Sequence, residues 1–174
     1  PGEKSLEYYR RRASGGCGLI ITEGTCVNHI AASGYPDVPY FWGEERLAAW
    51  QEIVDAVHAE GGKIAPQLWH CGGMRRAGTP PEGDVDGYTP SGMNVPGKVN
   101  RHIMTREDIA DVVRAFAEGA ADAKRLGFDA VEIDAVGNVV GRYKSDTPGA
   151  RTLLTGSHYD TVRNGGKYDG RLGI

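Results

Sequence analysis

The stretch EERLAAWQEIVDAVHAEGGKIAPQLW, residues 44–69, predicts a helix, a glycine stop and a buried strand, in that order. Two glutamates at its start suit the positive end of a helix dipole, and the glycine pair after Glu60 ends the helix. Pro66 lacks a backbone N–H and disfavours a central place for the strand. The apolar residues of the helix recur on one face: Leu47, Trp50, Ile53, Val54 and Val57.

Strands and helices of the same kind lie on both sides of this stretch. Residues 18–23, GLIITE, are short and continuously apolar through Ile21, as in a parallel strand buried on both faces. Amphipathic spacing over residues 6–13 predicts a helix before them, and residues 129–133 predict a third strand. Strands that alternate with helices form right-handed crossovers and a parallel sheet, so the fold class is α/β.

A long loop and a further helix separate the second predicted strand from the third. Residues 71–104 are rich in Gly and Pro, and a loop of this length is usually functional or an insertion. Thr105 then begins a helix with capping-box spacing, with Asp108 in the place of the usual Glu. One side of that helix is apolar: Ile109, Val112, Val113, Phe116 and Ala120.

The composition excludes several classes of protein. The apolar fraction of 40% and charged fraction of 25% are those of a soluble globular chain. A net charge of −3 without a basic block gives no footprint for nucleic acid, and no apolar run approaches the roughly 20 residues of a membrane span. Three scattered cysteines (Cys17, Cys26 and Cys71) fit reduced thiols in a cytoplasmic protein.

Polar and aromatic side chains follow two of the predicted strands. Gly24 ends the first strand, and Gln67 and Trp69 end the second. Parallel α/β folds keep their sites at the carboxyl ends of strands. A glycine there lets a planar ligand approach the backbone, and a glutamine offers both a donor and an acceptor. The alternative is that Gly24 only turns the chain and that Trp69 and His70 fill a core.

Three segments resemble the old yellow enzyme family of NADH:flavin oxidoreductases. They are ASGGCGLIITEGT, KIAPQLWHCG and MTREDIADVVRAFAEGAADAKRLGFDAVEI, and the resemblance covers about residues 5–133. It implies part of a (β/α)8 TIM barrel that binds FMN and takes its reducing equivalents from NAD(P)H. It also implies hydride transfer to a small-molecule substrate, typically an activated alkene.

The same resemblance implies roles for the residues at the strand ends. Gly24 would contact the flavin through its backbone, and Gln67 would hydrogen-bond the flavin pyrimidine edge. Trp69 would line the substrate pocket. We assign no chemical role to His70.

A different pattern begins after Ile133. His158 and Asp160 form an H-x-D pair after the strand-like TLLT, and Asp169 follows nine residues later. Imidazole and carboxylate are ligands that suit Zn or Mn, and one carboxylate can bridge two metals. A second Asp near the His can accept its other ring proton. The alternative is a solvated loop.

The segments DAVGNVVGRY, TLLTGSHYDTV and NGGKYDGRLGI, within residues 134–174, resemble the allantoate amidohydrolase and N-carbamoyl-L-amino-acid hydrolase family of dinuclear metallohydrolases. The resemblance implies a β-hairpin and a metal-ligand loop from a metallopeptidase-like α/β domain. His158 would bind one of two divalent metals, Zn or Mn, and Asp169 would bridge the pair. Asp160 would hydrogen-bond His158.

These observations predict a chimera with a join near Ile133. We expect a partial flavin-oxidoreductase barrel over residues 1–133, the start of an amidohydrolase domain over residues 134–174, and two incomplete sites. A non-catalytic fragment is the third interpretation. Exposed sheet edges predict self-association, which a monodisperse monomer in sedimentation would contradict. One transcript that runs across the join in the source would support a true fusion, and separate parent genes would contradict it.

Overall fold

All described residues belong to the first of two units, Pro1–Tyr143, while Lys144–Ile174 form the second. Within these described residues, no helix is long and apolar enough to cross a membrane. The computed structural model describes residues 1–79, 83–130, 132–133 and 139–140, with side chains through residue 130.

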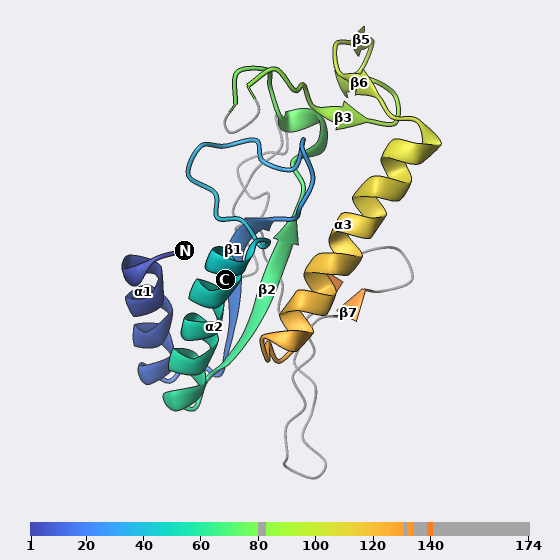
Figure 1. The fold of residues 1–174 in the computed structure, drawn as a ribbon. Coiled ribbons are helices and arrows are strands. Elements are labelled where there is room, and N and C mark those ends of the chain that lie inside the picture. The colour runs from blue at the N-terminus through green and yellow to red at the C-terminus, as the bar shows by residue number, and fades with distance from the viewer. Residues whose placement is uncertain (80–82, 131, 134–138, 141–174) are drawn as a thin grey trace. The chain divides into compact units, whose positions relative to one another are not determined.

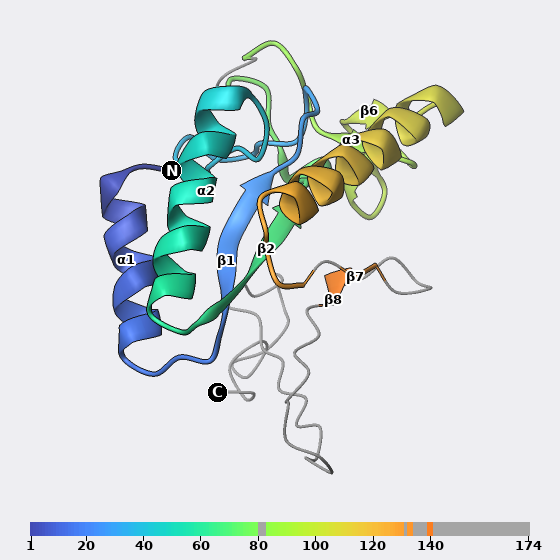
Figure 2. The ribbon, with the colours of Figure 1, turned by 60° about the horizontal axis from the view of Figure 1, so that its bottom comes forward.

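A pair of parallel strands forms the centre of this unit. β1 (Leu19–Cys26) and β2 (Lys63–Trp69) are joined through α2 (Glu44–Ala59), and α1 (Glu3–Ser14) precedes β1. α1 and α2 lie side by side along the strands (Figures 1 and 2). The β-α-β order and the parallel pairing confirm the predicted α/β class.

Pro66 is accommodated in β2 because β1 bulges opposite it. The register shifts between Ile21 and Gly24, so that two residues of β1 stand opposite the proline. Proline has no N–H to contribute to the ladder. The next N–H, that of Gln67, donates to the hydroxyl oxygen of Thr22 at 2.9 Å. The predicted strand is therefore confirmed, with a local irregularity at its proline.

The apolar face of α2 is the main wall of the core. All five residues expected on that face are buried. The helix ends at Ala59, just before the predicted glycine pair, and Gly61 adopts a positive φ of +80°. Trp50 lies at the centre of an aromatic cluster, with ring centroids 5.8 Å from Phe41 and 6.2 Å from both Tyr9 and Phe128. This cluster joins α1 and α2 to Phe41, which precedes α2, and to Phe128, which lies shortly after the last long helix ends at Arg125.

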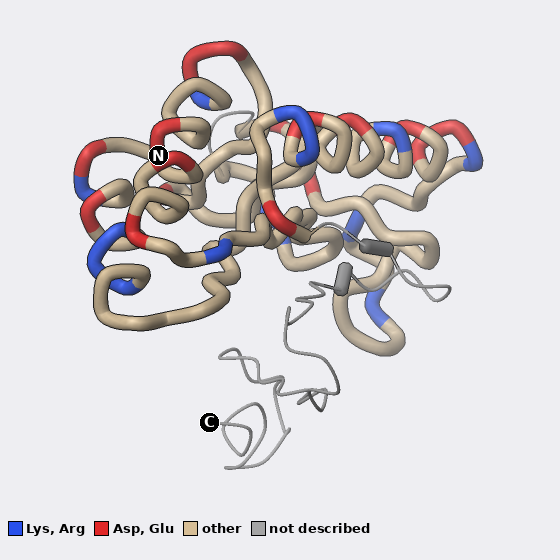
Figure 3. Tube along the Cα trace, turned by 90° about the horizontal axis from the view of Figure 1, so that it is seen from below, with Lys and Arg blue, Asp and Glu red and all other residues tan. Residues whose placement is uncertain are grey.

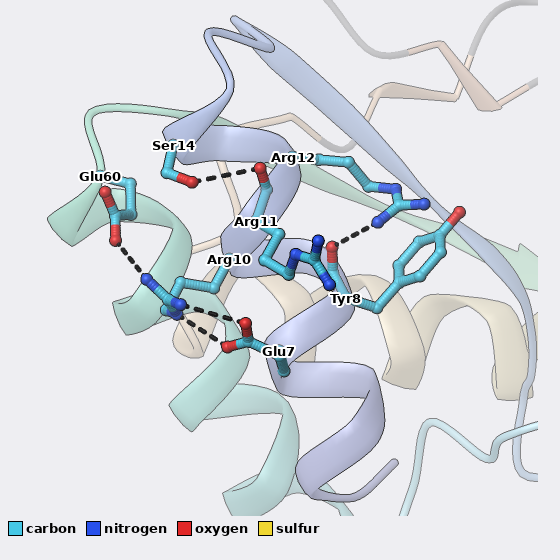
Figure 4. A network of polar contacts seen from close by, with 7 residues as sticks. All are labelled: Glu7, Tyr8, Arg10, Arg11, Arg12, Ser14 and Glu60. Carbon is cyan, nitrogen blue, oxygen red and sulfur yellow. Dashed lines mark hydrogen bonds and ion pairs between the residues drawn. The ribbon is translucent and has the colours of Figure 1, made fainter.

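Polar contacts also tie α1 to the end of α2 (Figure 4). The guanidinium of Arg10 lies 3.0 Å from Glu7 on its own helix and 2.8 Å from Glu60 at the end of α2. On the same helix, the Arg12 guanidinium lies 3.1 Å from the centroid of the Tyr8 ring. These contacts are exposed, so each adds little stability beside the apolar packing beneath them.

α3 (Arg106–Arg125) packs on β2 through small residues. Thr105 and Asp108 form the predicted capping box, with both reciprocal bonds present. The buried positions are Ala115, Gly119 and Ala123, which the sequence analysis did not name. Acidic and basic residues are interspersed along the outer side of the helix (Figure 3). The predicted apolar side is only partly used: Ile109 is 43% exposed and Val113 is 63% exposed.

The loop expected at residues 71–104 contains short ordered elements. They lie beyond the carboxyl ends of β1 and β2, near the start of α3 (Figure 1). The first is a short 3-10 helix, η1 (Gly72–Met74). β3 (Tyr88–Thr89) pairs in parallel with β6 (His102–Ile103), and β4 (Met93–Val95) forms an antiparallel hairpin with β5 (Lys98–Val99).

The third predicted strand forms a different pairing from the one expected. Asp129 begins as a parallel neighbour of β2 would, because its N–H donates to the carbonyl of Ile64 at 2.9 Å. However, β7 (Glu132–Ile133) pairs antiparallel with β8 (Val139–Val140). The Asp129 carboxylate accepts from the Ile64 N–H, at 2.9 Å. The Asp129 side chain thus accepts the hydrogen bond that the Ile64 N–H would otherwise donate to a neighbouring strand.

One face of the two-stranded sheet stays open among the described residues. Ile20, Ile64 and Leu68 are buried in the core with the helices. On the opposite face Ile21 is 57% exposed, and Gln67 is exposed as well. Self-association through exposed sheet edges remains a prediction.

Candidate functional site

The residues expected at the site meet at the carboxyl end of the sheet. Gly24 of β1 is the register partner of Gln67 of β2, and Cys26 is the partner of Trp69. Register partners in paired strands present their side chains on the same face. The structure therefore brings Gly24, Gln67 and Trp69 together at one end of the sheet.

Gly24 makes room for the indole of Trp69. A Cβ atom on Gly24 would lie 2.3 Å from Cε3 and 2.7 Å from Cδ2 of the ring. Carbon atoms in contact normally stand about 3.5–4.0 Å apart. The close neighbour of this glycine in the structure is thus the tryptophan, and the predicted flavin contact of the Gly24 backbone remains a prediction.

Tyr35 extends the aromatic wall that Trp69 begins. The two rings are stacked, with centroids 5.8 Å apart and planes inclined by 10°. Tyr35 is 48% exposed, so the stack borders solvent at the carboxyl end of the open face. Tyr35 could not be predicted from the sequence, because it lies in the irregular stretch after β1, where no periodicity shows which strand it approaches.

Gln67 presents an exposed side-chain amide on a fixed backbone. The backbone N–H of Gln67 donates to the Thr22 hydroxyl. That hydroxyl is buried and lies 3.2 Å from the hydroxyl of Thr25. The side chain is exposed on the open face. An amide has an acceptor and two donors, which is the chemistry needed to pair with a heterocyclic edge that carries both kinds of group.

His70 fastens the end of β2 to the segment after β1. Its Nδ1 accepts from the Gly72 N–H at 3.0 Å, so its proton lies on Nε2, 2.9 Å from Nδ1 of His29. That His29 atom also accepts from the Ala31 N–H at 3.2 Å. Burial, and next the neighbouring His29, lower the pKa of His70 to about 4. A neutral His70 with both nitrogens engaged is a positioning group.

A cavity of about 430 Å³ lies between the segment after β1 and α3. It contains none of the residues predicted for the site, and its acidic lining is already engaged: the Asp108 carboxylate accepts from the Thr105 N–H at 2.7 Å, and Asp111 and Glu118 lie 2.9 Å and 3.9 Å from Arg114. The open face of the sheet is therefore the better candidate site. The cavity is lined by Asn28, His29, Ile30, Tyr88, Asp108, Asp111, Arg114, Ala115 and Glu118.

The predicted metal residues His158, Asp160 and Asp169 lie outside the described residues. Within the part of the chain that the structure describes, no group of three or more His, Cys, Asp or Glu side chains is arranged to hold a metal ion.

Comparison with known proteins decides the family. The model of the NADH:flavin oxidoreductase / NADH oxidase family matches residues 2–152. The chain belongs to this family. It is 40% identical over 148 residues to the NADP-dependent oxidoreductase lnbE of Aspergillus flavus, and 33% identical over 163 residues to 12-oxophytodienoate reductase 2 of Arabidopsis thaliana. These matches cover 84% and 87% of this chain, but 39% and 43% of the two relatives.

Solved structures of the flavin oxidoreductase family share the fold. Morphinone reductase in complex with tetrahydroNAD matches with a TM-score of 0.66 at 33% identity, over 75% of this chain and 39% of that one. The old yellow enzyme homologue from Zymomonas mobilis matches with a TM-score of 0.63 at 31% identity, over 75% of this chain and 38% of that one. The chain spans about two fifths of the length of these relatives, and its fold is part of a (β/α)8 barrel.

The matched range bears on the predicted join. It continues through Ile133 to residue 152, so the first residues of the segment at 134–174 fall within the match to the flavin oxidoreductase family. The resemblance of that segment to an amidohydrolase rests on its sequence motifs. The boundary between residues 133 and 134 remains a prediction.

Proposed function

We propose that this chain is part of an FMN-dependent oxidoreductase of the ene-reductase type, which reduces a small-molecule alkene with NAD(P)H in the cytoplasm. The observation that carries the proposal is the register pair of Gly24 and Gln67 at the carboxyl end of a parallel sheet, in a chain of the flavin oxidoreductase family. Free thiols, with Cys17 exposed, fit a reducing compartment.

The residues at the open face fit a flavin by their donor chemistry. Gln67 would pair with the pyrimidine edge of the ring system, and the backbone at Gly24 would lie against it. The Trp69–Tyr35 stack would form an apolar wall for the substrate. Bound FMN would supply the hydride chemistry, which belongs to the cofactor. The chain's part is to orient that cofactor and to exclude water on the aromatic side.

Titration with FMN tests this proposal. We expect saturable quenching of flavin fluorescence by the full 174-residue chain, and at least about tenfold weaker binding by Gln67→Ala. Loss of a hydrogen-bonding amide in a ligand site costs about 1–3 kcal/mol, and 1.4 kcal/mol corresponds to a factor of ten. Gln51→Ala is the matched control, because that glutamine bonds Asp55 on the exposed side of α2. Equal affinities for the two variants would contradict the assignment of Gln67.

The alternative proposal is a metal-dependent amidohydrolase segment that acts on C–N bonds of ureido or carbamoyl compounds. It rests only on the sequence motifs around His158, Asp160 and Asp169, which come after the matched range that ends at residue 152. We expect Zn or Mn to stay bound to the chain after desalting and to be lost in His158→Ala. Elemental analysis that finds no metal after incubation with either ion would remove this alternative.

A further inference from the structure

Two of the three cysteines, far apart in sequence, meet in the structure. Cys26 ends β1 and Cys71 comes directly after His70 at the end of β2. Both are free and buried. Cys26 is the register partner of Trp69, two residues before Cys71, so the two cysteines are diagonal neighbours at the same end of the sheet, and each thiol shifts the pKa of the other. Cys17, by contrast, is exposed. From the sequence alone the three cysteines are merely scattered, because no spacing rule joins residues of different strands.

The backbone around the two thiols is fixed. The Cys26 N–H donates to Pro39 at 2.9 Å, and the Cys71 N–H donates to Ala32 at 2.9 Å. Gly34 lies against the second cysteine so closely that a Cβ atom there would be 2.9 Å from the Cys71 sulfur. The backbone of each cysteine is thus fixed by hydrogen bonds, and that of Cys71 also by the closely packed Gly34.

A buried arginine adds positive charge beside the pair. Arg75 is 0% exposed, and its guanidinium donates to the carbonyl oxygens of Val85 at 3.0 Å and Thr79 at 2.9 Å. It also donates to the carbonyl of Ser33, the residue before Gly34. A guanidinium in this position favours a thiolate nearby.

The two thiols are unequal. The hydrogen bond from Cys26, then the Gly34 N–H and the Arg75 charge, lower the pKa of Cys71 against the effect of burial. The same hydrogen bond and burial raise the pKa of Cys26. Cys71 retains 8% exposure and Cys26 none. The lowered pKa and the residual exposure of Cys71 make it the more reactive of the two thiols.

From this arrangement we propose that Cys26 and Cys71 are an oxidisable pair that closes a reversible disulfide when a peroxide reaches Cys71. The Cys71 thiolate attacks one oxygen of hydrogen peroxide, the O–O bond breaks, and a sulfenic acid and hydroxide form. The Cys26 sulfur then attacks the sulfenic sulfur, the S–S bond forms, and water leaves with the Cys26 proton. In total two thiols lose two electrons and two protons, and one peroxide becomes two waters.

The disulfide would act beside the candidate site. Gly34, which contacts Cys71, precedes Tyr35 of the aromatic wall. The Cys26 backbone is the register partner of Trp69 in the same wall. A covalent link between the ends of β1 and β2 would hold these two segments together, and a dithiol reductant would release them.

Peroxide treatment of the full chain in a Cys17→Ser background tests the pair, because Cys26 and Cys71 are then its only thiols. Under denaturing conditions we expect the thiol count to fall from two to none. An intact mass lower by two hydrogen atoms, a cross-linked Cys26–Cys71 peptide in a non-reduced digest, and full recovery with dithiothreitol should accompany that fall. Cys26→Ser should instead leave Cys71 to progress to sulfinic acid.

Three outcomes would overturn the inference. They are retention of both thiols, a disulfide between two molecules, and sulfinic acid at Cys71 in the background chain without a cross-linked peptide. Cys71→Ser keeps the size of the side chain and should show no loss of the Cys26 thiol, which identifies Cys71 as the reacting residue. Loss of the thiol in that variant would contradict the order of the two steps.

Discussion

Replacing Trp50 with alanine is expected to lower the free energy of unfolding by about 3–5 kcal/mol, the usual cost of removing a large aromatic ring from a core. Trp50 is 0% exposed and contacts Phe41, Phe128 and Tyr9. Its indole N–H also donates to the Tyr40 carbonyl at 3.1 Å. Because small domains hold only about 5–15 kcal/mol in total, we expect the cooperative urea transition at 25 °C to shrink or vanish.

Two further variants make this result interpretable. Trp42→Ala removes the same side chain from a half-buried position, where it lies 4.4 Å from the Arg46 guanidinium, and we expect a loss of about 1 kcal/mol. Trp50→Phe keeps an aromatic ring but removes the N–H that donates to the Tyr40 carbonyl. We expect it to lower the free energy of unfolding by about 1–3 kcal/mol. Similar losses for Trp50→Ala and Trp42→Ala in urea unfolding would show that the cluster is not the main source of stability.

The sequence is a reliable guide where one periodic segment meets one buried surface. The face of α2 could be predicted in full because five large apolar residues recur at helical spacing over the sheet. The capping box at Thr105 was equally visible, since it depends on residues three apart. The grouping of Gly24 with Gln67 followed from the parallel order of the strands, because their carboxyl ends must share an edge.

Contacts between a helix and a strand, or between an irregular segment and a strand, could not be predicted in this way. α3 buries Ala115, Gly119 and Ala123, because a helix comes close to a strand through its small residues rather than its largest ones. Tyr35 reaches Trp69 from a stretch without regular structure. These placements depend on where separate elements come to rest, which no local pattern records.

Gly24→Ala is expected to displace the Trp69 indole and to lower the free energy of unfolding by about 1–3 kcal/mol, as overpacking usually does. The added carbon would stand 2.3 Å from a ring atom, so the ring or the strand has to move. Trp69 borders the open face, and the ring can move outward only by leaving its stack with Tyr35. We therefore expect a changed near-ultraviolet circular dichroism signal together with the loss of stability.

Gly18→Ala separates this steric effect from the general effect of a glycine replacement. A Cβ atom on Gly18 meets nothing within 4 Å, and the residue lies just before the same strand. We expect Gly18→Ala to change the free energy of unfolding by less than about 0.5 kcal/mol, as exposed substitutions do. Equal free energies of unfolding in urea for Gly24→Ala and Gly18→Ala would show that the position of the Trp69 ring does not require a glycine at residue 24. The space beside Gly24 would then be free for the contact between its backbone and the flavin that the proposed function assigns to it.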